Sequence, residues 1–178
     1  MKVLVVIASQ TGRTRRMAEA FAEGARGAGA ETELIAAEAA DPARVRRCDA
    51  LALGSGVHMA GPESSMRAFF ERMAPLWMEG ALIGKIGAAF VTGGSGGRGG
   101  AELTLISLWA TLAEHGLLLV PMHNRLPHYA EAGCHWGPVA WTNARSGGVG
   151  PTSEHLEAAR AHGGHVAECV ARWGLRQS

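Results

Sequence analysis

The first residues of the chain contain the feature that most restricts its fold, an apolar strand that turns at once into a helix. The apolar run 3–8 is followed by Ser9-Gln10-Thr11-Gly12-Arg13-Thr14 and then by a stretch of helical period, residues 15–26. A helix that starts in this way presents backbone N–H groups without intrahelical partners, and its dipole favours an anion there. Gly12 permits close approach of the backbone, and the hydroxyl side chains add donors. The segment predicts a phosphate-binding loop, although the same residues would also cap a helix that binds nothing.

Short apolar runs alternate with segments of helical period along the whole chain. The runs expected to form strands are residues 2–8, 31–36, 49–55, 85–92 and 117–120. Between the third and fourth runs, apolar residues recur at steps of three and four, at Met66, Phe69, Phe70, Met73, Leu76 and Trp77. A last helix is expected from the same spacing of Leu156, Ala159, Gly163, Val166, Val170 and Trp173. This alternation predicts an α/β protein, with a parallel sheet covered by helices on both faces.

Length and composition favour one domain, residues 1–178, with 47% hydrophobic residues to fill its core. Lys and Arg number 17 against 16 acidic residues, and this balance argues against nucleic acid as the main partner. The three cysteines are scattered, which disfavours a disulfide framework or a thiolate metal centre. No apolar run approaches membrane-spanning length, and the chain starts with a strand rather than a signal segment. We therefore expect no membrane insertion and a cytoplasmic protein.

Three loops follow the carboxyl ends of predicted strands, where ligands bind in this architecture. They are residues 9–14, residues 54–62 and residues 92–100, and six of the nine residues in the third are glycine. A flexible linker would have a similar composition, but linkers rarely separate a core strand from a core helix. A phosphate loop beside two glycine-rich loops suits a mononucleotide that carries a large planar ring.

Several longer segments, taken together with the first loop, resemble a known family. They are Ser65-Met66-Arg67-Ala68-Phe69, Leu76-Trp77-Met78-Glu79-Gly80-Ala81-Leu82-Ile83-Gly84-Lys85, Trp109-Ala110-Thr111-Leu112-Ala113-Glu114-His115-Gly116 and Val120-Pro121. With these motifs in this order, residues 2 to about 172 resemble the WrbA-type NAD(P)H:quinone oxidoreductases, FMN enzymes of the flavodoxin-like superfamily. The resemblance implies a flavodoxin-like three-layer sandwich, with five parallel strands in the order 2-1-3-4-5.

The resemblance also implies a role for each loop in binding FMN. The first loop would hold the phosphate, through Ser9, Gln10, Thr11, Gly12, Arg13 and Thr14. The second would flank the isoalloxazine ring, through Ser55, Gly56, Val57, His58, Met59 and Ala60. The third would hydrogen-bond the pyrimidine end of the ring, through Thr92, Gly93, Gly94, Ser95, Gly96 and Gly97. In such enzymes NADH or NADPH passes hydride to the flavin N5 and leaves, and a quinone then takes two electrons in the same pocket.

Two further side chains match the family's pocket. His115 matches a histidine that lines it and is the candidate catalytic residue, and Trp77 matches an aromatic contributed across a subunit boundary. The family is typically tetrameric, so we expect a homotetramer. From the residues alone, His115 would equally suit a helix C-terminus and Trp77 the apolar core. His162 and His165 lie one helical turn apart, but no third ligand is evident, so we expect no metal.

Some positions depart from the family pattern. Gly56 and Val57 stand where the family has Pro and Thr, and His58 and Met59 stand where it has Arg and Phe. Asn124, expected in the substrate pocket, replaces a tyrosine. Two alternatives to the quinone oxidoreductase therefore stay open, a flavodoxin-like electron carrier and a flavodoxin fold with weakened or lost FMN binding. The balanced charge counts against the carrier, because such carriers are usually acidic around the flavin.

Overall fold

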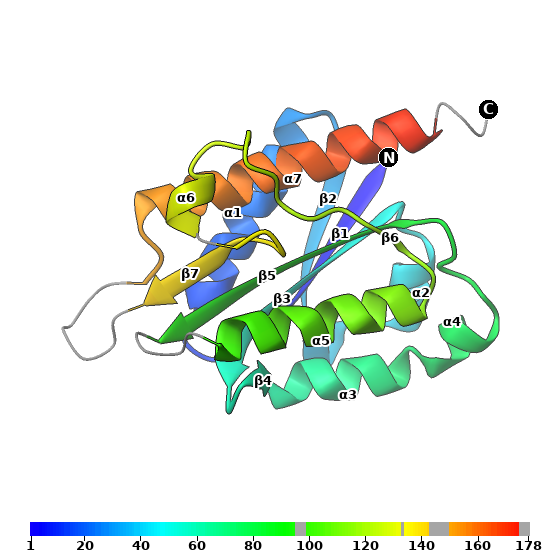
Figure 1. The fold of residues 1–178 in the computed structure, drawn as a ribbon. Helices are drawn as coiled ribbons and strands as arrows, with labels where there is room; N and C mark the ends of the chain where they lie inside the picture. The colour runs from blue at the N-terminus through cyan, green and yellow to red at the C-terminus, as the bar shows by residue number, and fades with distance from the viewer. Residues whose placement is uncertain (95–98, 133, 143–149, 175–178) are drawn as a thin grey trace.

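The computed structural model describes residues 1–94, 99–132, 134–142 and 150–174, which form a sheet between two layers of helices (Figure 1). The strands are β1 (Lys2–Ala8), β2 (Glu31–Ala36), β3 (Ala50–His58), β4 (Gly61–Pro62), β5 (Ile86–Gly94), β6 (Leu118–Leu119) and β7 (Val139–Thr142). The helices are α1 (Arg13–Gly27), α2 (Pro42–Arg46), α3 (Ser64–Arg72), α4 (Ala74–Met78), α5 (Gly100–Glu114), α6 (Tyr129–Ala132) and α7 (Ser153–Gly174), with a 3-10 turn η1 (Ala37–Ala39).

The main path of the sheet runs β2-β1-β3-β5-β6. Counted as the sequence predicts them, these strands have the order 2-1-3-4-5, so the expected architecture is confirmed. The expected number of five strands is too low, because β4 pairs antiparallel with β3 and β7 pairs parallel with β5. Strand β4 pairs with the last residues of β3, and β7 pairs with the last residues of β5. Both therefore extend the sheet at the carboxyl ends of its strands, where the three loops begin.

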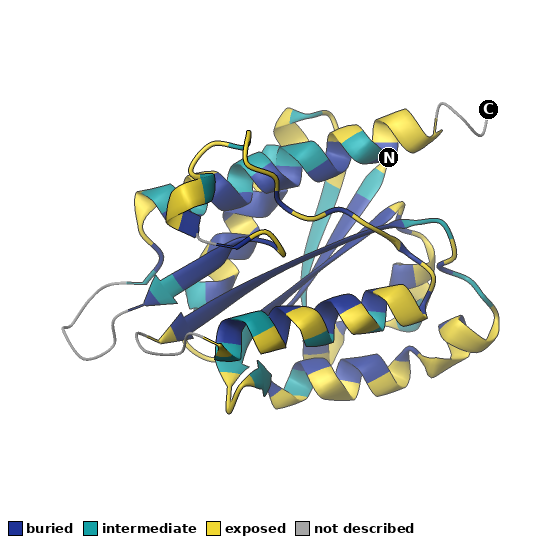
Figure 2. Cartoon of the chain, in the orientation of Figure 1, coloured by how far each residue is buried: buried dark blue, intermediate teal, exposed yellow. Residues whose placement is uncertain are grey.

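Successive side chains of β1 enter two different hydrophobic cores. Val3, Val5 and Ile7 pack with α1 and α7, whereas Leu4 and Val6 pack with α3 and α5. Figure 2 shows the central strands almost entirely buried and the helices buried only on their inner sides. A strand covered on both faces needs apolar residues at every position, which explains the unbroken run 3–8.

Helices α1 and α7 meet at two glycines. A Cβ added to Gly163 would overlap the carbonyl oxygen of Phe21, and one added to Gly24 would overlap the carbonyl oxygen of Arg160. Only glycine therefore allows the two backbones to come this close. The contact fixes α1, whose first turn lies beside the phosphate-loop residues, against the C-terminal helix.

The apolar stripe of residues 66–77 belongs to two helices rather than one. Helix α3 ends at Arg72, and α4 starts again with Pro75 in its first turn, where the missing N–H of proline has no cost. Leu76 is buried as expected, but Trp77 is 50% exposed. The expectation of simple core packing for Trp77 is therefore wrong, because the new helix turns this side chain away from the core.

Candidate functional site

The phosphate-loop residues lie where β1 passes into α1. Gly12 precedes the helix with φ +78°, in the left-handed region that glycine adopts without strain, and forms no side-chain cap. The Ser9 hydroxyl accepts a hydrogen bond from the N–H of Arg15 at 3.3 Å, so one helix donor is capped. The N–H groups of Arg13 and Thr14 have no partner among the described residues. These two donors are available to an anion.

A cavity of about 130 Å³ lies where the three loops meet. It is lined by Gln10, Thr11, Arg13, Thr14, Gly56, Val57, His58, Thr92, Gly93, Gly94 and Thr142. All three predicted loops contribute, and so does Thr142 of β7, which the sequence analysis does not identify. Because a cavity needs only about 10–15 Å³ of such space to hold one water, this cavity has room for a group the size of a phosphate. We call it the phosphate cavity.

The other expected cofactor residues lie around this cavity or beyond the described ranges. The residues that do not line it are Ser9, Gly12, Ser55, Met59 and Ala60. Those of the third loop that lie outside the described residues are Ser95, Gly96 and Gly97.

Two hydroxyl contacts join the first loop to the ends of β5 and β7. The Oγ1 atoms of Thr14 and Thr92 lie 2.8 Å apart, and both residues are buried. The Thr142 hydroxyl donates to the carbonyl oxygen of Gly93 at 3.1 Å and accepts from the Arg13 guanidinium at 3.2 Å. Arg13 is thereby held at the wall of the phosphate cavity, and no acidic residue in the first turn of α1 offsets its charge.

The second loop is a short β-hairpin. Met59 and Ala60 form the two-residue turn between β3 and β4, with φ values of +47° and +62° that are uncommon for residues other than glycine. The Met59 side chain is fully exposed. Behind the turn, the buried Ser55 hydroxyl donates to the carbonyl of Gly56 at 2.8 Å and accepts from the N–H of Glu63 at 3.0 Å. These bonds hold the hairpin in place beside the phosphate cavity.

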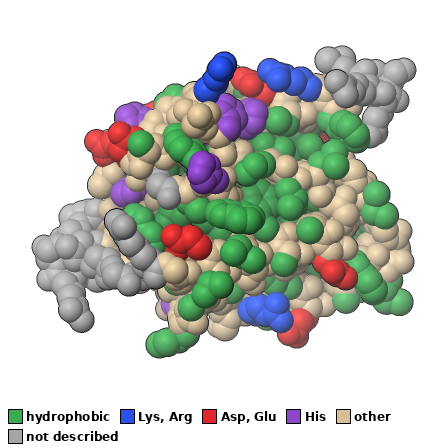
Figure 3. All heavy atoms as spheres, viewed as in Figure 1, with side chains coloured by type: hydrophobic (Ala, Val, Ile, Leu, Met, Phe, Trp, Pro, Cys, Tyr) green, Lys and Arg blue, Asp and Glu red, His purple; other side chains and the backbone are tan. Residues whose placement is uncertain are grey.

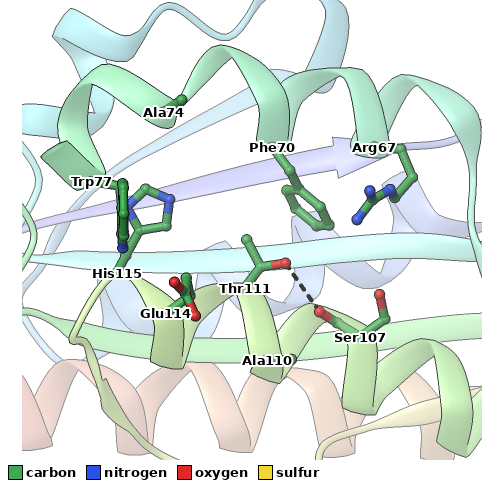
Figure 4. A pocket seen from close by; sticks show the side chains of 9 residues that line it. All are labelled: Arg67, Phe70, Ala74, Trp77, Ser107, Ala110, Thr111, Glu114 and His115. Atoms are coloured by element: carbon green, nitrogen blue, oxygen red, sulfur yellow. Dashed lines mark hydrogen bonds between the residues drawn. The ribbon is translucent and has the colours of Figure 1, made fainter.

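His115 and Trp77 line a different cavity, between α3, α4 and α5 (Figure 4). Its volume is about 380 Å³, and its lining residues are Arg67, Phe70, Ala74, Trp77, Ser107, Ala110, Thr111, Glu114 and His115. Figure 4 shows Trp77 and His115 at one end of this groove and Arg67 and Phe70 at the other. The groove and the phosphate cavity share no lining residue, so one chain does not bring His115 to its own three loops. Asn124 is exposed between β6 and α6 and lines neither cavity.

His115 follows the last residue of α5 and is only 6% exposed. Its Nδ1 atom is buried and has no hydrogen-bond partner in the described part of the chain. Burial lowers the pKa of His115 below its ordinary 6.5, against the opposite effect of Glu114. The neutral imidazole is therefore favoured at neutral pH, and the interpretation of His115 as a cation at the helix C-terminus is not supported.

The described ranges contain no group of three or more His, Cys, Asp or Glu side chains placed to bind a metal ion. His162 directs Nε2 toward the carbonyl oxygen of Val120, 2.8 Å away, rather than toward a shared ligand position with His165. Among the helices of these same ranges, none combines the length and apolar character needed to cross a membrane.

Comparison with known proteins agrees with this architecture. The flavodoxin family model matches residues 5–112. The NAD(P)H dehydrogenase (quinone) of Paraburkholderia phymatum is 34% identical, over 96% of this chain and 98% of the relative. That of Methylocella silvestris is 35% identical with the same coverage. The solved structure of a WrbA-like flavodoxin protein from Agrobacterium tumefaciens has a TM-score of 0.75 and 25% identity, over 96% of this chain and 98% of that one. The chain therefore belongs to the flavodoxin family and, within it, to the group of its curated relatives, the NAD(P)H dehydrogenase (quinone) proteins.

Proposed function

We propose that the protein is an FMN-dependent NAD(P)H:quinone oxidoreductase. The observation that carries this proposal is the phosphate cavity, in which the start of α1, with two N–H groups left unpaired within the described residues, meets the ends of β3, β5 and β7. Unpaired N–H groups, hydroxyls and the Arg13 guanidinium are the donors that a phosphate ester prefers. The names of the curated relatives support the nicotinamide donor and the quinone acceptor.

The flavin ring would be held outside the phosphate cavity by the residues that border it. Met59 and Ala60 of the hairpin would provide apolar contact, and the backbone of Gly93 and Gly94 would provide hydrogen-bonding groups. A Cβ on Gly94 would meet no atom within 4 Å, so its backbone is open to a flat ligand. When bound, FMN would supply the redox chemistry, by accepting hydride from the nicotinamide and giving two electrons to the quinone.

The groove that contains His115 would complete the site of a second copy of the chain, in the homotetramer that the resemblance predicts. Trp77 at its end is 50% exposed, and Met78 beside it is 79% exposed. Helix α5 also turns Leu103 and Ile106 outward, on a face where Figure 3 shows many hydrophobic side chains. A helix that is apolar on both sides is normally buried on both. A second copy would cover this face, and the end of the groove that contains Trp77 and His115 would then border the neighbouring site.

The proposed function is tested by titrating the purified apoprotein with FMN and following flavin fluorescence and absorbance. We expect saturable binding of one FMN per chain, followed by oxidation of NADH or NADPH when a quinone is added. Binding of FMN without NAD(P)H oxidation by any quinone would favour the electron carrier instead. No binding at tens of micromolar FMN would overturn the proposal and favour a fold that has lost its flavin.

A further inference from the structure

The His58 ring folds back over Gly56 at the wall of the phosphate cavity. A Cβ built on Gly56 would lie 3.2 Å from Nε2 of His58 and 3.9 Å from Oγ1 of Thr14. The imidazole therefore lies in tight contact with the point where a side chain at position 56 would start, on the side that faces the first turn of α1. A residue with a Cβ at this position would push the ring away by a few tenths of an ångström.

A second basic side chain reaches the same cavity from the opposite loop. The Arg13 guanidinium is anchored by the Thr142 hydroxyl, which is itself hydrogen-bonded to the carbonyl of Gly93. Arg13 and His58 are the ionisable side chains among the described lining residues, and none of these residues is acidic. Two basic groups, free backbone N–H donors and a volume of about 130 Å³ suit a phosphate monoester better than any neutral group of the same size.

We propose that His58 is a phosphate-binding residue, admitted to the cavity by Gly56, and that it makes flavin affinity depend on the terminal phosphate. This inference rests on the proposed flavin site, and it moves His58 from the isoalloxazine ring, where the resemblance places the second loop, to the phosphate. It also explains why two departures from the family pattern occur together. The lack of a side chain at position 56 lets the ring at position 58 lie closer to the cavity by a few tenths of an ångström.

The test compares FMN with riboflavin, which has the same ring and no phosphate. The measured quantity is the ratio of the riboflavin Kd to the FMN Kd for each purified apoprotein. Replacement His58→Ala should weaken FMN binding by about tenfold or more, the usual effect of losing a charged hydrogen bond, and should leave riboflavin binding unchanged. His58→Gln, which keeps a donor near the position of Nε2, should recover part of the loss.

Position 56 provides an independent test of the same contact. Gly56→Ala retains His58 but shifts its ring by a few tenths of an ångström, so it should lower the ratio in the same direction as His58→Ala, by a smaller factor. In the double variant the two effects should not add, because both remove one interaction. Additive effects would show that Gly56 does not act through His58.

Met59→Ala on the same hairpin is the matched control. Its proposed contact is with the ring, so the binding of FMN and of riboflavin should weaken by the same factor and the ratio should stay constant. Inorganic phosphate should compete with FMN in the unmodified protein and less well in His58→Ala. Circular dichroism would verify that each variant is folded.

Two outcomes separate this inference from the proposed function. If the unmodified protein binds FMN but His58→Ala keeps the same ratio, the assignment of His58 is wrong and the flavin site stands. If the unmodified protein binds neither flavin, the proposed function itself fails. Competition by inorganic phosphate with a ratio near one would mean that the cavity takes free phosphate rather than the flavin ester, and would also overturn the inference.

Discussion

The Thr14 and Thr92 hydroxyl oxygens lie 2.8 Å apart in the interior, although 78 positions separate the two residues in the chain. Thr14 belongs to the first turn of α1, and Thr92 lies near the end of β5. Their side chains therefore join the two elements whose loops border the phosphate cavity. The position of the helix start relative to the sheet depends on this buried pair.

Replacement Thr14→Val removes one hydroxyl from the pair without a large change in shape. We expect the free energy of unfolding to fall by about 1–3 kcal/mol, because the Thr92 hydroxyl is left buried and unpaired. Urea denaturation measures the change. Thr14→Ser should retain most of the stability, and the double variant Thr14→Val with Thr92→Val should recover part of it. Equal stability of Thr14→Val and the unmodified protein would contradict this role for the pair.

Two adjacent glycines of α7 should respond in opposite ways to alanine. Gly163→Ala would drive a methyl group into the Phe21 carbonyl, and we expect a loss of about 3 kcal/mol or more. At Gly164 the nearest backbone atom, the carbonyl oxygen of Gly24, would be 3.4 Å from the new Cβ. Gly164→Ala should therefore be neutral or stabilising, since alanine is favoured over glycine within helices by about 1 kcal/mol. Thermal unfolding distinguishes the two, and similar melting temperatures would rule out the close packing of α1 against α7.

His162 should make the protein less stable in acid. It is completely buried, its Nε2 bonds to the Val120 carbonyl, and its Nδ1 has no partner within the described ranges. Burial lowers its pKa from 6.5 to about 4; the hydrogen bond to Val120 raises the pKa, and His165 and His123 lower it further.

The direction of the pH effect on stability depends on whether the folded or the unfolded chain binds the proton of His162 more readily. Because the folded pKa lies below 6.5, the unfolded chain takes up the proton first as the pH falls. The contribution of His162 is therefore complete above about pH 6.5 and falls by about 3 kcal/mol between there and pH 4. Urea denaturation from pH 8 to 4 should show a steeper loss for the unmodified protein than for His162→Gln. Parallel curves would exclude His162 as the source.

Trp77 should act in assembly rather than in the fold of one chain. Because its side chain is half exposed, Trp77→Ala should change the unfolding free energy of the isolated chain little, while it should weaken association of copies in light-scattering measurements. The adjacent Leu76 is 2% exposed, and Leu76→Ala should instead destabilise the chain by about 2–5 kcal/mol. A monomeric unmodified protein would contradict the proposed assembly.

The central strands are predictable from the sequence because burial on both faces requires unbroken apolar runs. The strands β4 and β7 are not predictable in this way. Strand β4 has only two residues and is defined by its pairing with β3. The exposure of Trp77 is also not predictable from the apolar pattern. The apolar spacing continues through position 77, and only Pro75 signals that a new helix begins and changes the direction of the side chains.

The three loops of the candidate site are predictable because parallel strands end at one edge of the sheet. Thr142 is not, since its contact with Arg13 joins residues 129 positions apart. A hydroxyl at the end of the apolar run 139–141 is the one local signal for it. The separation of His115 from the phosphate cavity also depends on tertiary placement, and the roles assigned to both regions stay predictions.

The close contact of α1 with α7 has a consequence for the order of events during synthesis. Arg160 of α7 bonds to Glu23 of α1 across 137 positions, next to the glycine contacts that join the two helices. On the ribosome, the helix that follows the phosphate loop therefore emerges early and lacks its covering neighbour until α7 has been translated. The proposed binding of flavin by the nascent polypeptide would have to wait for that late step.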